Sequence, residues 1–152
     1  MAGNSHKISK YDWLLDSGTT SLICPIQEAF SEFQPVQEIL NSVGEIGTPV
    51  TGYGNVKIKF QFDGKIFVHQ LQDVLYVLGV PNCLLSLNRI DDGGGSVDFK
   101  GGVCWIKDKG EKVIGKGYKH QRLYMLFTRA ILPKIEKANY ASTRKLTWDQ
   151  WH

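Results

Sequence analysis

Features that define several protein classes are missing from this sequence. No apolar run approaches the roughly 20 residues of a membrane-spanning helix, and the first ten residues are polar, without the apolar segment of a secretory signal peptide. The three cysteines, Cys24, Cys83 and Cys104, are odd in number and widely spaced, which is typical of a reducing compartment rather than of a disulfide framework. We therefore expect a soluble, intracellular globular domain.

Motifs for metals and cofactors are missing as well. The sequence has no Cys-x-x-Cys pair, and its four histidines are isolated from one another, so we expect no metal site and no cofactor. The net charge of +3 is too small to indicate a nucleic-acid-binding protein, because such proteins usually concentrate basic residues on one face.

Glycine, in contrast, is plentiful, and it separates short segments rich in β-branched and aromatic residues. The 16 glycines in 152 residues predict an all-β domain with many turns. Residues 56–62 alternate between apolar and polar, which indicates a strand with one buried face, and the pair Asp63-Gly64 after them predicts a tight hairpin turn. A second hairpin is expected to turn at residues 108–110. The expected strands are residues 11–15, 56–62, 65–71, 74–77, 96–99, 103–107, 112–115 and 123–127.

Helical patterns are few. After Pro25, apolar residues recur at the spacing of one helical face and predict a short helix; they are Ile26, Ala29, Phe30 and Phe33. A further helical turn or two is expected over residues 87–91, ended by the three glycines that begin at Gly93.

The composition changes after Phe127, where both the alternation and the glycines stop. We therefore predict a flexible N-terminal segment over residues 1–10 and one domain over residues 11–127. Residues 128–152 are expected to form a linker or tail that packs only in places and leads toward a following region.

The candidate for chemistry is the segment Trp13-Leu-Leu-Asp-Ser-Gly-Thr-Thr20. An apolar strand would fix Asp16 on a rigid floor, and Gly18 would allow a tight turn beside it. The hydroxyls of Ser17 and Thr19 could orient the acid by hydrogen bonds with neighbouring backbone and carboxylate oxygens. The same residue types also favour an ordinary turn at the end of a strand, so the triplet alone leaves both interpretations open.

Aspartic proteases use two carboxylates about 3 Å apart that share one proton. One carboxylate takes a proton from the attacking water while the other hydrogen-bonds the scissile carbonyl. This chain has no second Asp-Ser-Gly or Asp-Thr-Gly, since its other Asp-Gly pairs, at Asp63 and Asp92, lack the hydroxyl residue between. A dyad can therefore form only across the two-fold axis of a homodimer.

Four segments resemble the proteases of copia-type (Pseudoviridae) LTR retrotransposons, which belong to the retropepsin group. The first is the loop around Asp16, and the second, residues 43–56, is similar to the flap hairpin of that family and the strand after it. The third, residues 71–86, is the most specific and is similar to the family's Asp-Val-Leu-Tyr-Val-Pro…Asn-Leu-Leu-Ser segment. The fourth, residues 113–126, resembles the closing strands. Two positions depart from the pattern: Ser86 replaces the glycine of retroviral proteases, and Cys83 replaces the usual asparagine.

The resemblance implies a retropepsin-like acid protease barrel, active as a two-fold homodimer. The implied function is endopeptidase cleavage of a retrotransposon Gag-Pol polyprotein by water that Asp16 activates, without a cofactor. The implied location is the cytoplasm, within virus-like particles, with no membrane partner and with no nucleic acid expected. The implied residues are Asp16, Ser17, Gly18 and Thr19 for catalysis, Gly44, Glu45, Ile46 and Gly47 for a substrate-binding flap, and Leu84 and Leu85 for support beneath the catalytic loop.

Other interpretations stay open on the sequence. The glycines at residues 44–47 could belong to an inert hairpin, and Trp105 and Tyr124 are expected in the core or on a sheet face rather than at a substrate. A domesticated or inactive copy could serve in peptide binding or assembly. A nucleic-acid-binding fragment would use the basic residues of the tail together with Trp148 and Trp151.

Overall fold

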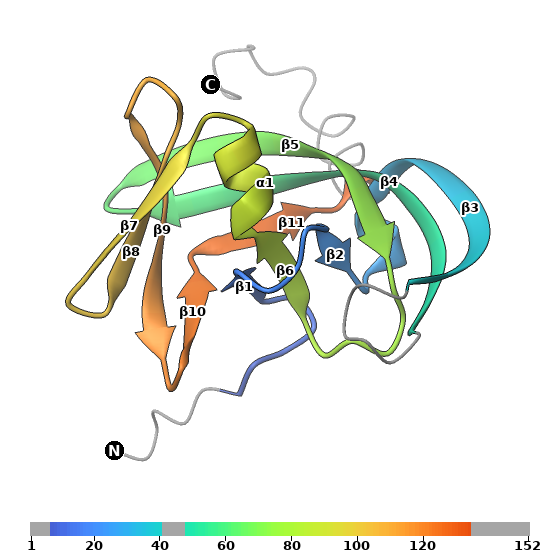
Figure 1. The fold of residues 1–152 in the computed structure, drawn as a ribbon. Helices are drawn as coiled ribbons and strands as arrows, with labels where there is room; N and C mark the ends of the chain where they lie inside the picture. Colours follow the sequence, from blue (N-terminus) through green and yellow to red (C-terminus); the bar gives the residue numbers. More distant parts are fainter. Residues whose placement is uncertain (1–6, 41–47, 135–152) are drawn as a thin grey trace, which may run out of the picture.

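Figure 1 shows strands that curl around a central region, with one short helix beside them. This computed structural model describes residues 7–40 and 48–134. The strands are β1 (Trp13–Asp16), β2 (Ile23–Cys24), β3 (Phe30–Leu40), β4 (Thr48–Phe62), β5 (Lys65–Tyr76), β6 (Cys83–Ser86), β7 (Ser96–Lys100), β8 (Val103–Lys107), β9 (Val113–His120), β10 (Leu123–Leu126) and β11 (Thr128–Ile131). A 3₁₀ turn, η2 (Gln27–Ala29), and the helix α1 (Leu87–Asp92) complete the described elements. The expectation of an all-β, barrel-like fold is confirmed.

The eleven strands form one sheet in the order β11-β4-β5-β2-β6-β1-β10-β9-β8-β7, and β3 pairs with β4. β1 therefore lies inside the sheet, parallel to β6 on one side and antiparallel to β10 on the other. β6 in turn separates β1 from β2, so the loop between these two strands crosses the end of β6. This arrangement places the segment after Asp16 on a floor of paired strands.

Both predicted hairpin turns are present. Asp63 and Gly64 join β4 to β5 with φ angles of 50° and 73°, as the twist-compatible two-residue turn requires. Between β8 and β9, the Asp108 carboxylate accepts hydrogen bonds from the backbone N–H groups of Gly110 and Lys112, each at 2.9 Å. The side chain of Asp108 thus supplies the acceptors that the turn backbone needs.

The expected strands over residues 65–71 and 74–77 are one continuous strand, β5. The interruption in the sequence pattern is a bulge: the β4–β5 register shifts between Gly54 and Val56, and Asp73 opposite has a φ of 57°. One extra residue on β5 is accommodated there without ending the pairing.

The helix predicted after Pro25 is wrong. A single 3₁₀ turn ends at Ala29, and the chain continues as β3 because it pairs with β4 from Phe30 onward. Register shifts in β3, one of them at Glu32 with a φ of 54°, change which residues share a face. The apolar residues are still buried together: the rings of Phe30 and Phe33 each pack edge-to-face on Tyr76, with centroids 5.6 and 5.8 Å apart.

The predicted domain end at Phe127 also needs correction, because β11 follows it and pairs with β4. The backbone of Phe127 bridges two ladders: its N–H donates to Lys116 and its carbonyl accepts from Gln61. Thr128 is buried, and Leu132 packs against the core. The rest of the predicted tail, residues 135–152, and residues 1–6 lie outside the described residues.

The main core gathers apolar side chains from both halves of the sheet, with Trp13, Val56 and Ile58 almost fully buried. All three cysteines are fully buried. Tyr124 packs against this core and Trp105 is half-buried on β8. Within the described part of the chain, no helix is long and apolar enough to cross a membrane.

Candidate active site

Asp16 is the last residue of β1, and it lies opposite Ser86 in the parallel pairing with β6. Because side chains alternate along a strand, Asp16 shares a sheet face with Leu14, whose neighbours across the sheet are Leu84 and Met125. Leu14 and Met125 are each only 4% exposed. The carboxylate therefore projects from the end of a well-packed strand while remaining half-exposed itself.

The residues after Asp16 turn back toward its carboxylate. The backbone N–H of Gly18 donates to Asp16 Oδ1 at 2.7 Å. A Cβ atom at Gly18 would lie 3.3 Å from the same oxygen, so glycine permits this close approach. Ser17 and Gly18 are exposed. The strand fixes the position of the acid, and the Gly18 amide fixes its orientation.

Thr19 is buried and fastens the loop to the fold. Its hydroxyl accepts from the backbone N–H of Ser21 at 3.1 Å. Its carbonyl oxygen accepts two side-chain hydrogen bonds, from Ser86 Oγ at 2.8 Å and from Asn88 Nδ2 at 3.3 Å. The same Ser86 Oγ caps α1 by accepting from the backbone N–H of Arg89 at 3.2 Å. One hydroxyl thus joins the loop after Asp16 to the start of the helix.

Ser86 and Asn88 were not among the expected site residues. Ser86 appeared in the sequence only as a departure from glycine, and the departure has a structural use: a glycine there could neither cap α1 nor bond to Thr19. A serine directly before a predicted helix is an N-cap signal. The hydrogen bond from Ser86 to the carbonyl oxygen of Thr19, however, follows only from the pairing of β6 with β1.

Leu84 and Leu85 pair with Leu14 and Leu15 between β6 and β1, and their supporting role for the loop stays a prediction. They face opposite sides of the sheet. Leu85 is 4% exposed and belongs to the main core, whereas Leu84 packs on a second, smaller cluster. Together they fill both faces of the floor beneath the loop.

The second cluster joins the loop's floor to the β3–β4 hairpin. It contains Ile23, Val50, Val77, Val36, Leu75, Val80 and Leu84. Val36 and Val50 come from the hairpin, while Ile23 and Leu84 flank the Asp16 loop. The flap residues expected between β3 and β4, namely Gly44, Glu45, Ile46 and Gly47, lie outside the described residues. What the structure describes is an apolar connection between the strands of that hairpin and the strands beside the candidate site.

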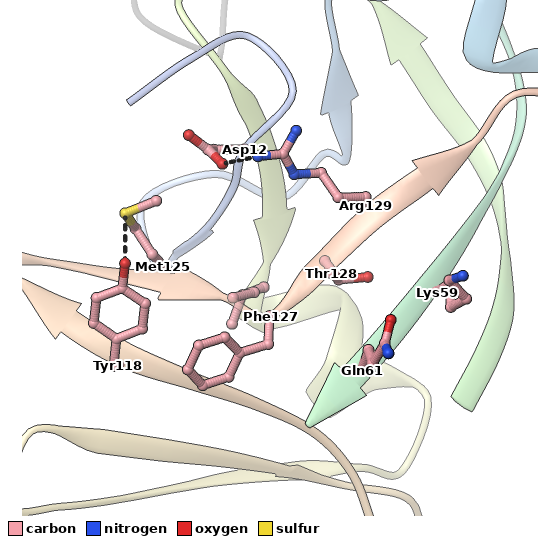
Figure 2. Close-up of a pocket in the computed structure, with 9 residues that line it drawn as sticks. Asp12, Lys59, Gln61, Tyr118, Met125, Phe127, Thr128 and Arg129 are labelled. Atoms are coloured by element: carbon pink, nitrogen blue, oxygen red, sulfur yellow. Dashed lines mark hydrogen bonds and ion pairs between the residues drawn. The ribbon is translucent and has the colours of Figure 1, made fainter. Parts of the chain in front are cut away.

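A cavity of about 300 Å³ lies at the opposite end of β1 from Asp16 (Figure 2). There, buried Asp12 accepts from Arg129 Nη2 at 3.1 Å and from the backbone N–H of Ser9 at 2.8 Å. The buried hydroxyl of Thr128 has no hydrogen-bond partner within the described residues. This end of β1 is tied to β11 and is separate from the Asp16 loop.

The described part of the chain contains no cluster of side chains that could bind a metal ion. No group of three or more His, Cys, Asp or Glu side chains comes close enough there to hold an ion. The candidate chemistry of this site rests on one carboxylate per chain, oriented by a backbone amide.

Comparison with known families is consistent with this arrangement. A family model described as Pol polyprotein, beta-barrel domain, matches residues 13–95, more than half of the chain, from the start of β1 to the turn after α1. No curated protein and no solved structure matches the chain. The matched segment contains the Asp16 loop, the β3–β4 hairpin, β6 and the helix that Ser86 caps. The chain therefore belongs to the Pol polyprotein beta-barrel domain family of retroelements.

Proposed function

We propose that this domain is one subunit of a retropepsin-like aspartic endopeptidase from a copia-type retrotransposon, and that it processes the Gag-Pol polyprotein. The observation that carries the proposal is the support of Asp16. Its carboxylate stands at the end of a strand paired on both sides, and Gly18 N–H donates to it at 2.7 Å. The hydrogen bond alone is shared with ordinary turns, since Asp108 accepts the same kind of bond from the Gly110 N–H. Asp16 differs in standing at the end of a strand that is paired on both sides, and catalysis needs an acid held in one geometry.

The proposed chemistry requires two chains. Two copies related by a two-fold axis would bring their exposed loops at residues 17–18 together and place two Asp16 carboxylates side by side. One carboxylate would take a proton from water, and the water oxygen would attack the peptide carbonyl. The protonated partner would donate a hydrogen bond to the carbonyl oxygen. The first carboxyl would then pass the proton that it took from water to the nitrogen of the leaving amine as the C–N bond breaks. No covalent intermediate is involved.

Substrate binding would use an extended polypeptide. The β3–β4 hairpin offers backbone groups for strand addition, and the half-buried members of the second cluster, such as Val36 and Leu84, offer apolar surface for aliphatic side chains. The proposed partners are a second copy of this chain and the polyprotein substrate, and the proposed location is the cytoplasm, within virus-like particles.

The nucleic-acid alternative has less support. Arg129, one of the basic residues on which it relied, is paired with Asp12, and Trp148 and Trp151 lie outside the described residues. An inactive peptide-binding copy would keep the same fold and the same turn at Asp16, so only a cleavage assay separates it from an active protease.

The test is cleavage of a degenerate library of unstructured peptides, read by mass spectrometry. The full chain should cut peptides, and Asp16→Asn should abolish cutting while leaving the melting temperature within a few degrees of the wild type. Asp91→Asn, which changes an exposed aspartate on α1, is the matched control and should cut normally. Cleavage by purified Asp16→Asn would overturn the proposal. Peptide binding without cleavage by the wild-type chain would favour the inactive copy.

A further inference from the structure

Two cysteines that are distant in the sequence meet where β6 begins, beside Trp13 at the start of β1. The antiparallel pairing of β2 with β6 places Ile23 opposite Leu84, so Cys24 and Cys83 form the next facing pair. Their sulfur atoms are 3.6 Å apart, and both residues are fully buried. Facing residues of antiparallel strands have Cα atoms about 4.5–5.5 Å apart, within the range of disulfide-bonded cysteines.

We propose that Cys24 and Cys83 form a thiol–disulfide site, at which reversible oxidation joins β2 to β6 covalently. Small side-chain rotations would bring the sulfurs to bonding distance, because the strand pairing already aligns the two Cα–Cβ bonds. The inference is independent of the proposed proteolysis, since it needs only the fold.

The environment differs between the two thiols. The Cys83 thiol donates to the Cys24 sulfur, and this hydrogen bond holds the pKa of Cys24 below its ordinary value. The same hydrogen bond, together with burial, raises the pKa of Cys83. Cys24 is therefore the sulfur that attacks first, since the thiolate is the nucleophile.

With a low-molecular-weight disulfide as oxidant, the step balances in two exchanges. The Cys24 thiolate attacks one sulfur of the oxidant, breaks its S–S bond and releases the first small thiol. Cys83 then loses its proton and attacks the Cys24 sulfur of the mixed disulfide, which releases the second small thiol. Two cysteine thiols are oxidised, and one small disulfide is reduced to two thiols.

The reaction needs a local opening, because both sulfurs are buried. β2 has only two residues, so few ladder hydrogen bonds must break to expose Cys24. Cys83 Sγ lies 3.4 Å from the carbonyl oxygen of Lys10, in the segment before β1. Opening at β2 or at this segment would expose the two sulfurs to a small oxidant while the longer strands stay paired.

The consequence for the fold is a fixed frame around the Asp16 loop. β6 pairs with β1, which precedes the loop, and with β2, which follows it. A bond between residues 59 apart in the sequence also restricts the unfolded chain, which stabilises the folded state. The oxidised form is therefore expected to melt several degrees higher than the reduced form.

The experiment uses the full folded chain, incubated with oxidised glutathione and then alkylated in denaturant without reductant. Reduced protein should take up three alkyl groups, and oxidised protein only one, on Cys104, with full uptake restored by dithiothreitol. Cys24→Ser and Cys83→Ser should form no internal disulfide. Cys104→Ser changes another fully buried cysteine and is the matched control, which should still form the bond and gain melting temperature.

The proposal would be overturned if the protein still took up three alkyl groups after oxidation, or if Cys104 rather than Cys24 and Cys83 became protected from alkylation. A disulfide between two chains, or a glutathione adduct on Cys24 that Cys83 does not displace, would also contradict it. An unchanged melting temperature on oxidation would contradict the effect on the fold. If the serine variants fail to fold, a peptide map of the wild-type chain decides, because a linked Cys24–Cys83 peptide supports the site and its absence contradicts it.

Discussion

The hydroxyl of Ser86 donates a 2.8 Å hydrogen bond to the carbonyl oxygen of Thr19, and both groups are buried. The bond spans 67 residues of sequence and joins the loop after Asp16 to the helix that begins after Ser86. Because the same oxygen also caps α1, the position of the loop and the start of the helix depend on each other.

Ser86→Ala is expected to lower the free energy of unfolding by about 1–3 kcal/mol, because it removes a helix cap and a buried hydrogen bond. In the proposed protease it should also lower kcat more than it raises KM, since the Asp16 loop loses an anchor. Urea unfolding and peptide cleavage measure the two effects. The control is Ser96→Ala, at an exposed position on β7, where less than about 0.5 kcal/mol is expected. Equal effects of the two substitutions would contradict the role of Ser86.

Thr128→Val should leave the free energy of unfolding unchanged or raise it by about 1 kcal/mol, because it replaces a buried hydroxyl that has no described partner by a methyl group of similar size. Thr51→Val makes the same chemical change where the hydroxyl donates to the carbonyl of Tyr76 at 3.3 Å, and it should be neutral or destabilising. Thermal melting of both variants provides the comparison. A clear loss of stability in Thr128→Val would mean that its hydroxyl is hydrogen-bonded in solution.

Truncation tests the extent of the domain. A chain that ends at residue 127 loses β11, whose four residues pair with β4, and the ion pair between Arg129 and Asp12. We expect a loss of about 3 kcal/mol or more, since several ladder hydrogen bonds of about 1 kcal/mol each disappear and a buried carboxylate loses a partner. A chain that ends at residue 134 keeps both features and serves as the control. If circular dichroism gave the same melting temperature for both chains, the domain would end at Phe127 as the sequence predicted.

The proposed dyad predicts a bell-shaped dependence of kcat/KM on pH, with its maximum below neutrality. The mechanism needs one protonated and one ionised carboxylate in the dyad, a combination that is lost when the solution becomes either too acidic or too alkaline. Initial rates across acidic to alkaline pH measure the profile, with circular dichroism as the control for folding. A rate that rises steadily into the alkaline range would point to a different nucleophile.

Dilution should lower the specific activity of the proposed protease. Each chain supplies one carboxylate, so the active fraction follows the dimer fraction by mass action. We expect a weak dimer that a peptide inhibitor in the cleft strengthens. Sedimentation and cleavage measured over the same concentration series test this. Constant specific activity in a protein that sediments as a monomer would exclude the two-fold dyad.

Local features of the chain could be predicted from the sequence because they depend on neighbouring residues. The alternation of residues 56–62 indicated a half-buried strand, and Asp63-Gly64 indicated its turn, since these two residues adopt positive φ at low cost. The apolar strand before Asp16 and the helix after Ser86 were expected for the same kind of reason. The match over residues 13–95 confirms the Pol polyprotein relationship, whereas the catalytic roles stay predictions.

Only the tertiary structure decided which distant segments meet. Phe30 and Phe33 have helical spacing, yet their segment becomes β3 because an edge of β4 is available to pair with it. The rest of that edge is taken by β11, which the loss of alternation and of glycine after Phe127 did not indicate. The contact of Cys24 with Cys83 follows from the β2–β6 register in the same way. The sequence by itself determined the turns, the strand periodicity and the motif around Asp16, because these are short-range preferences. The hydrogen-bond partners of Thr19, Asp12 and Cys24 were decided by strand pairing, because the free energy of pairing is summed over residues that lie far apart in the chain.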